Sequence, residues 1–327
     1  MVSIRKYLFR RLLQIIPFVL LTVAFNFVLI NLAPGDPAAV IAGEDASTEY
    51  VEALRKEYGL DKPIIVRLGI YLKHFVTLDL GYSYAFNRPV IDLILERIPN
   101  TLLLVVVGKI IAIFLGIILG VWSAGRFGSK IDNLFMAITV VMYSAPVFWV
   151  GIILILVFAV KLDWLPTSGI MSMSWGLSPF QEFVDRIKHL VLPLTTMVIT
   201  MIPIYIRTTR ASVIEVKHED FILTARAKGL TEREILIRHA LKNALLAPVT
   251  MAGISFGLVF TGSLLVETIF AWPGLGRLMY QAIFRRDYPL LMGIFAISAL
   301  SVMIFSLLTD LIYMVLDPRV RLEQKTK

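Results

Sequence analysis

Long apolar runs separated by shorter polar segments set the pattern of this 327-residue chain. About 20 consecutive apolar residues in a helix cross a hydrocarbon layer of about 30 Å. Six runs approach or exceed that length, and we interpret them as six transmembrane helices: Leu12–Asn31, Thr101–Ala124, Leu134–Val160, Leu190–Ile206, Leu245–Val266 and Leu290–Leu316. The third run holds 27 residues, so we expect it to tilt or to bend at Pro146. The pattern therefore predicts an all-α, polytopic membrane protein.

The polar segment of residues 32–100 is long enough to form an extracytoplasmic loop or lobe of its own. Ser47 can cap a first short helix, which Gly59 would end. Pro63 can begin a second helix, with an aromatic-rich sequence through Phe75. Such a helix suits the membrane surface, and it suits the interior of a small lobe equally well.

Basic residues indicate how the six helices are oriented. If residues 1–11 are cytoplasmic, that side carries 18 lysines and arginines and the other side 13, seven of them in the long polar segment. An excess of basic residues marks the cytoplasmic side, and long loops count least. We expect four parts: a cytoplasmic N-terminus with the first transmembrane helix, an extracytoplasmic segment, a five-helix core and a cytoplasmic tail. Their bounds are 1–31, 32–100, 101–316 and 317–327, and residues 207–245 of the core then lie in the cytoplasm.

Residues 219–245 carry an unusually complete set of helix signals. Phe221 and Ala225 lie four residues apart on one side of a first short helix. Gly229 follows where a helix commonly ends in the left-handed conformation. Thr231 and Glu234 have the spacing of a capping box that opens a second helix. Two short helices joined at a glycine elbow suggest a docking element, and an amphipathic helix resting on the bilayer is the alternative.

Composition excludes several classes of function. Hydrophobic residues make up 57% of the chain and charged residues 17%, whereas soluble globular chains carry about 25% charged residues. The net charge of +8 is therefore attributed to membrane orientation and not to nucleic-acid binding. The chain has no cysteine and four scattered histidines, which gives little basis for a metal site. It has no G-x-x-x-x-G-K-[ST] loop and no visible filter repeat, so we expect a membrane scaffold driven by a separate protein.

Few polar side chains lie within the apolar runs. Lys109, in the second run, either lines a pathway, snorkels to the interface or pairs with an acid of a neighbouring helix. Tyr143, Ser144 and Thr200 either face a translocation pathway or satisfy hydrogen bonds between helices. Two G-x-x-x-G patterns would allow close contact between helix backbones: Gly116–Gly120 and Gly253–Gly257.

Six groups of short motifs, in order along the chain, resemble those of one family. They are Ala33–Pro37, Leu80–Ser83 with Arg88–Val90, Arg97–Thr101, Thr224–Leu230 with Arg238–Ala244, Trp272–Gly276 with Arg286–Pro289, and Leu316–Arg319. On these motifs the chain resembles the inner-membrane permease subunits of ATP-binding-cassette importers. The closest likeness is to the B-type subunit of the dipeptide/oligopeptide (peptide/nickel) branch, and it covers nearly the whole length.

The resemblance implies a heteromeric complex in the inner (cytoplasmic) membrane of a prokaryote. A second homologous permease pairs with such a subunit within the lipid bilayer. Two cytoplasmic ATPases bind ATP and Mg, and an extracytoplasmic solute-binding protein delivers a di- or oligopeptide or a related small solute. The permease itself carries no cofactor, no catalytic residue and no nucleic-acid site. A stand-alone secondary transporter or channel remains the alternative.

In such importers the elbow fits a groove on the ATPase. The resemblance implies that Ala225 and Gly229 make the tight contact with the ATPase and that Thr231 and Glu234 shape the turn. It also implies that Arg226 and Lys228 pair with acids of the ATPase. The sequence departs from the broader importer pattern E-A-A-x₃-G at its first position, where Leu223 replaces the acid. We therefore expect no acid-to-arginine contact there.

Overall fold

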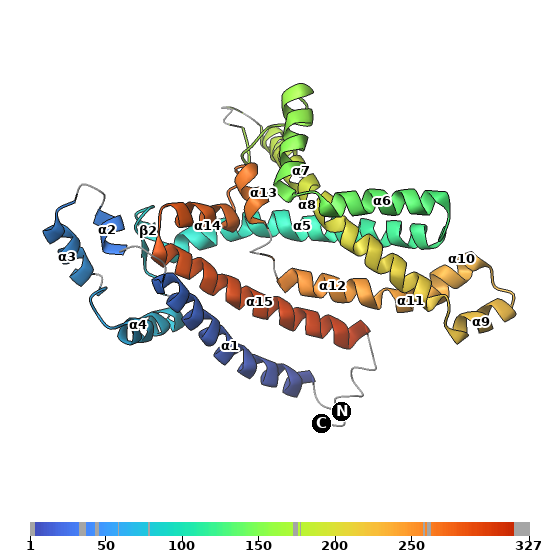
Figure 1. Ribbon diagram of the computed structural model, residues 1–327, viewed down its shortest axis with the longest axis horizontal. Helices are drawn as coiled ribbons and strands as arrows, with labels where there is room; N and C mark the ends of the chain where they lie inside the picture. The colour runs from blue at the N-terminus through green and yellow to red at the C-terminus, as the bar shows by residue number, and fades with distance from the viewer. Residues whose placement is uncertain are drawn as a thin grey trace. The chain divides into compact units, whose positions relative to one another are not determined.

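In the computed structural model, the described residues are 4–32, 37–42, 46–57, 59–77, 79–172, 176, 178–257, 259 and 263–316. Most of the first motif, residues 33–36, and the predicted tail, 317–327, lie outside them. The described chain is almost entirely helical, with one small hairpin of β1 (Tyr82–Ser83) and β2 (Arg88–Pro89) (Figure 1). It divides into two compact units, and α5 (Val90–Ala124) and α15 (Tyr288–Leu316) contribute residues to both.

The first unit comprises residues 1–101 and 273–304. Besides parts of α5 and α15, its helices are α1 (Ile4–Leu32), α2 (Pro37–Ala42), α3 (Thr48–Glu57), α4 (Ile64–Val76) and α14 (Leu275–Phe284). Val23 of α1 and Ala296 of α15 are buried against Tyr71 of α4. The other side of α4 exposes Ile65 and Val76. One side of this predicted second helix therefore packs on α1 and α15 within the first unit, while its opposite side forms an exposed apolar surface.

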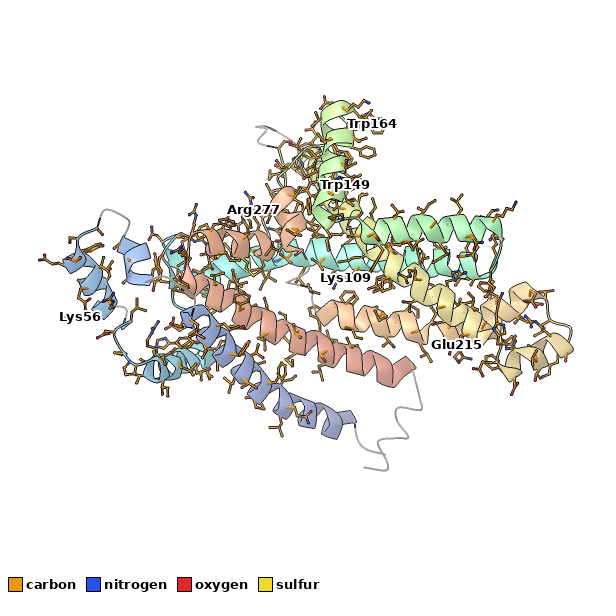
Figure 2. All side chains as sticks on the ribbon, in the orientation of Figure 1. Lys56, Lys109, Trp149, Trp164, Glu215 and Arg277 are labelled. Carbon is orange, nitrogen blue, oxygen red and sulfur yellow. The ribbon has the colours of Figure 1, made fainter. Side chains whose placement is uncertain are left out.

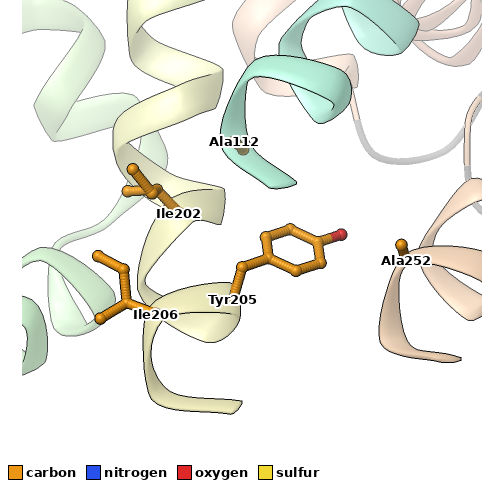
Figure 3. Packing of buried hydrophobic residues seen from close by; sticks show 5 residues of the cluster. All are labelled: Ala112, Ile202, Tyr205, Ile206 and Ala252. Carbon is orange, nitrogen blue, oxygen red and sulfur yellow. The ribbon is translucent and has the colours of Figure 1, made fainter. Parts of the chain in front are cut away.

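The second unit comprises residues 102–272 and 305–327. Its further helices are α6 (Lys130–Ser144), α7 (Val147–Leu154), η1 (Ile155–Lys161), α8 (Pro179–Val216), α9 (Asp220–Ala227), α10 (Glu232–Glu234), η2 (Ile235–Ala240), α11 (Leu241–Ala244), α12 (Leu246–Gly257) and α13 (Leu264–Ile269). Figure 3 shows part of its core, where side chains of α5, α8 and α12 meet. The buried residues drawn there are Ala112, Ile202, Tyr205, Ile206 and Ala252.

Small residues let these helices approach closely, as the G-x-x-x-G patterns predict. A methyl group on Gly120 would lie 2.7 Å from Thr209 Cβ and 2.8 Å from the Ile206 carbonyl oxygen of α8. One on Gly116 would meet the side chain of Tyr205, also in α8. Gly253 of α12 makes the same kind of close contact with α15. The predicted close packing is confirmed at these three glycines.

Among the described residues, three helices are long and apolar enough to cross a membrane: α5, α8 and residues 288–309 of α15. Helices 130–144 and 147–161 are bent by 100° relative to each other, and they make a fourth candidate if together they form one broken span. The predicted bend at Pro146 is thus confirmed. Among the residues of α1 whose side chains the structure describes, Leu13–Leu29 form an apolar helical stretch. Helix α8 runs for 38 residues, so it extends well beyond the predicted fourth run, Leu190–Ile206.

The predicted fifth run, Leu245–Val266, is not one continuous helix. Helix α12 ends at Gly257, and α13 begins only at Leu264. At that break the Ser255 carbonyl oxygen accepts a hydrogen bond from Lys109 Nζ, and the Val259 amide donates to Phe256 instead of continuing the α-helical pattern. Glycine also has a low helix propensity. A side chain from another helix therefore takes a carbonyl that a continuous helix would have used.

Candidate functional site

The elbow follows directly after α8, as Figure 1 shows for α9, α10 and α11. Helix α9 ends in a turn where Gly229 has a φ of +80°, in the left-handed region. The Gly229 amide donates to the Arg226 carbonyl at 2.9 Å, and the Leu230 amide donates to the Ala225 carbonyl at 3.4 Å. This pair of bonds is a Schellman motif, which occupies carbonyls left free at a helix end. The predicted left-handed glycine is therefore confirmed.

A capping box opens the second half of the elbow. The Glu234 amide donates to Thr231 Oγ1 at 3.3 Å, and the Thr231 amide donates to Glu234 Oε2 at 3.0 Å. The backbone and hydroxyl donors of Thr231 lower the pKa of Glu234 because they stabilise its carboxylate. The spacing of these two residues thus predicted the cap correctly.

The second helix is less regular than its sequence predicts. Between the short helices α10 and α11, residues Ile235–Ala240 form a π-helical segment. Ile235 and Ala240 are five residues apart and both fully buried. A π-helix aligns residues at about this spacing, whereas in an α-helix they would point to different sides. The burial of both side chains accounts for the departure from α-helical geometry.

The elbow has a small hydrophobic core of its own. Ile222 and Ala225 from α9 pack on Ile235 and Ala240 from η2. Ala225 is only 4% exposed, so its small side chain serves the contact between the two halves of the elbow. Gly229, in contrast, is exposed, and a Cβ placed on it would have no atom within 4 Å. The surface at the tip of the elbow is therefore formed by the glycine turn and not by Ala225.

An ion pair spans the glycine turn. Arg226 Nε donates to Glu232 Oε1 at 2.7 Å, and both side chains are exposed. The hydrogen bond raises the pKa of Arg226 and lowers that of Glu232, because each charge favours the other. Arg226 thus has an internal partner. Lys228, which like Arg226 is expected to pair with an acid of a partner protein, is exposed and makes no ion pair within the described part of the chain.

The elbow is anchored to the ends of two long helices. Ala244 of α11 is buried with Ala124 of α5 and Val213 of α8. Leu236 of η2 packs against this cluster and also against the core of the elbow. A displacement of the elbow would therefore be transmitted to α5 and α8 through packed side chains.

A buried ion pair next to this anchor was not predicted from the sequence. Arg210 Nη2 and Nε donate to the two carboxylate oxygens of Asp132 at 2.7 and 3.0 Å. Asp132 is fully buried, and it also accepts hydrogen bonds from Ser123 Oγ and from the Gly128 amide. The pair joins α6 to α8, and Ser123 adds the end of α5. The only sequence signal was an acid in a short basic segment.

The polar residues inside the apolar runs have different surroundings. Lys109, labelled in Figure 2, is 2% exposed. Its Nζ donates to the Ser255 carbonyl and lies 5.4 Å from the centroid of the Phe256 ring. It therefore neither snorkels nor pairs with an acid among the described residues. Thr200 donates to the Thr196 carbonyl of its own helix. Its hydroxyl is satisfied within α8.

Tyr143 and Ser144 lie at the exposed end of α6. Tyr143 lines an open cavity of about 690 Å³ between α6 and α8, together with Arg207, Thr208 and Ser212. The Arg207 guanidinium lies 5.8 Å from the centroid of the Tyr143 ring. Glu215, near the end of α8 in Figure 2, lines the same cavity. Of the four predicted pathway residues, only Tyr143 lines this cavity.

Comparison with known proteins assigns nearly the whole chain. Residues 112–322 match the family described as binding-protein-dependent transport system inner membrane component. Residues 4–105 match the N-terminal region described for the membrane component of the same kind of transport system.

Individual relatives match over the same extent. The oligopeptide transport system permease protein AppB of Bacillus subtilis (strain 168) is 39% identical over 315 residues, which cover 96% of this chain and 98% of AppB. The glutathione transport system permease protein GsiC of Escherichia coli O6:H1 is 36% identical over 316 residues, or 97% of this chain and 99% of GsiC. A probable peptide ABC transporter permease protein of Sinorhizobium fredii is 38% identical over 315 residues, with 96% and 99% covered.

Proposed function

The chain belongs to the family of binding-protein-dependent transport system inner membrane components, and from this premise we propose its substrate class, its partners and its coupling site. It is a non-catalytic permease component in the inner membrane, and partner ATPases supply ATP hydrolysis. The substrate is a di- or oligopeptide or a related small peptide such as glutathione. Support comes from the oligopeptide and glutathione transport for which AppB and GsiC are named, because this chain matches both almost from end to end.

The complex that carries out transport contains four further subunits. A second, homologous permease completes the pathway through the bilayer, and two ATPases bind on the cytoplasmic side. An extracytoplasmic solute-binding protein delivers the peptide. Six transmembrane helices, with both termini in the cytoplasm, give the permease its topology. The excess of basic residues in segments 1–11 and 207–244 supports this orientation.

The elbow of residues 219–245, within the proposed membrane core 101–316, is the ATPase-coupling site. The observation that carries this proposal is the exposed Gly229 turn, held by the Schellman motif and the capping box on a packed base. Lys228 is free to meet an acidic group, and Gly229 lets a partner approach the backbone closely. Thr231 and Glu234 shape the turn, Arg226 braces it through Glu232, and Ala225 packs its interior.

A bilayer-bound amphipathic helix is less compatible with this element, because part of its apolar surface packs internally, between its two halves. Ile222 and Ile235 are fully buried within the elbow. The exposed apolar side chains Phe221, Leu223 and Ile237 instead offer contact area to a partner protein. Near the proposed pathway, the open position of Tyr143 makes it the best of the predicted residues to contact solute, and Ser144 adjoins it.

Two substitutions at Gly229 test the coupling site. Asparagine tolerates the left-handed conformation, whereas tryptophan adds bulk to the exposed tip. We expect Gly229→Asn to retain the turn and most uptake, and Gly229→Trp to insert normally but to separate ATP hydrolysis from uptake in reconstituted vesicles. Uptake by Gly229→Trp equal to that by Gly229→Asn would contradict the docking role.

Purification of the tagged permease from its native membrane tests the wider proposal. A second permease and two ATPases should copurify, and transport should stop when ATP is depleted. Transport that continues on an ion gradient without ATP, with no ATPase recovered, would instead identify a stand-alone secondary transporter.

A further inference from the structure

A second cavity, within the first compact unit, combines basic and aromatic side chains. Its volume is about 500 Å³, within the range of small-molecule sites. Helices α1, α3, α4 and α15 and the β-hairpin segment all contribute lining residues. Lys56, Lys62 and Arg67 supply positive charge, and Tyr71, Tyr82 and Tyr84 supply aromatic rings. Figure 2 shows Lys56 on α3.

Arg67 is the most constrained of the three cations. Its guanidinium donates to Asn31 Oδ1 at 2.6 Å and lies 6.0 Å from the centroid of the Phe27 ring. Burial lowers its pKa because the charged form loses water. Within the described residues no carboxylate lies within 4 Å of Arg67, Lys56 or Lys62. A partly buried cation without a counter-ion is costly, and a bound anion would remove that cost.

Among the described residues that line the cavity, one acid, Asp79, faces these charges and does not balance them. Asp79 accepts a hydrogen bond from the Gly81 amide and lies 2.7 Å from His74 Nδ1, and these interactions lower its pKa. Its carboxylate is thus already occupied by its neighbours. The described lining residues therefore give the cavity a net positive charge.

We propose that this cavity binds an anionic group, with Arg67 as its central ligand and Lys62 and Lys56 at its rim. Two sources supply such a group where a peptide permease meets the membrane: the terminal carboxylate of the transported peptide and the phosphate of a lipid headgroup that carries a net negative charge. Guanidinium groups recognise both anions through paired N–H donors. The peptide source rests on the proposed function. The anion site itself does not.

The test measures binding to the purified permease complex in nanodiscs, without ATP and without the solute-binding protein. The probes are trialanine and trialanine amide, which differ in the carboxylate. In phosphatidylcholine discs we expect trialanine to bind and the amide to bind at least about tenfold more weakly, since a hydrogen bond to a charged group is lost. Arg67→Gln should weaken trialanine binding by a similar factor. Arg88→Gln is the matched control, because Arg88 lies outside the cavity and pairs with Glu96.

Phosphatidylglycerol discs distinguish the lipid source. If a headgroup fills the site, native mass spectrometry should find phosphatidylglycerol retained by the wild type and lost in Arg67→Gln, and trialanine should no longer bind. Lys62→Gln decides the question if Arg67→Gln fails to assemble. The proposal would be overturned if Arg67→Gln (or Lys62→Gln) and Arg88→Gln had equal effects on trialanine binding and on phosphatidylglycerol retention in both kinds of disc. ATPase copurification, scored in the same samples, reports separately on the proposed function.

Discussion

Asp132 and Arg210 form the most demanding contact between single residues in the second unit. The carboxylate is fully buried, and the guanidinium reaches it with two donors from a helix 78 residues further along the chain. Removing one partner of such a pair leaves the other charge buried without compensation, which costs about 3 kcal/mol or more. We expect Arg210→Met to lower the free energy of unfolding by that amount, measured by denaturation of the purified protein in detergent.

Two further variants separate the ion pair from a general effect of losing an arginine. Arg186→Gln removes an exposed arginine near the start of α8, which makes no ion pair or ring contact within the described part of the chain, and should change stability by less than about 0.5 kcal/mol. The double variant Asp132→Asn with Arg210→Met removes both charges and should recover part of the loss. A double variant less stable than Arg210→Met alone would show that the pair is not the cause.

The elbow depends on carboxylates whose pKa values are lowered, which sets the sign of its pH dependence. Glu232 and Glu234 have folded pKa values below the ordinary value of about 4.3. Their contribution to the stability of the elbow is therefore complete above pH 5, and it is lost as the pH falls through the lowered pKa values. A bimane label on Lys228→Cys, unique because the chain has no cysteine, should show constant anisotropy from pH 8 to 6 and a fall below about 4.

The variant Glu234→Gln keeps a neutral side chain able to cap the second half of the elbow. In the labelled protein it should reduce the anisotropy change at low pH. A transition between pH 6 and 7 would assign control of the elbow to a histidine instead.

The candidate site was predictable from the sequence where its contacts are local. Gly229, Thr231 and Glu234 act within a few residues of each other, so spacing alone identifies the turn and its cap. Asp132 and Arg210 meet only after three helices pack together, and a single sequence gives no pattern that predicts their pairing. The internal partner of Arg226 was missed although it is only six residues away, because an exposed arginine offers no pattern that selects one acid over another.

At the scale of elements, the hydrophobic runs located three helices long enough to cross a membrane, and a fourth if the bent pair is one span, but not the ends of these helices. The apolar part of α8 ends near Ile206, yet the helix continues to Val216 because its later turns pack on α5 and α11. The π-helical segment and the break after α12 were also missed. Contacts from other helices are made at both places: Ile235 and Ala240 are buried against α9, and Lys109 of α5 donates to the Ser255 carbonyl.

The contact between α5 and α8 gives a prediction for paired helices. A methyl group at Gly120 would overlap both a side chain and a backbone oxygen of α8, and backbone cannot move aside cheaply. We expect Gly120→Ala to destabilise the protein by about 1–3 kcal/mol. Gly69→Ala is the matched control, because Gly69 is exposed in α4 and its added methyl meets nothing within 4 Å. There, alanine should be neutral or stabilise by up to about 1 kcal/mol. Equal effects in thermal denaturation would refute the close contact.

At the scale of the whole molecule, the length of α8 constrains the topology. A helix of 38 residues is about 57 Å long, so its two ends should emerge on opposite sides of a hydrocarbon layer of about 30 Å.

Single cysteines at exposed positions can report each side by labelling with an impermeant maleimide in spheroplasts. We expect Lys73→Cys and Glu182→Cys to react from outside, and Lys130→Cys and Lys228→Cys only after permeabilisation. Reaction of Glu182→Cys and Lys228→Cys from one side would exclude α8 as a span, and the reverse pattern would invert the orientation derived from the basic residues. The expected pattern would place the elbow on the same side as cytoplasmic ATP, as coupling through Gly229 requires.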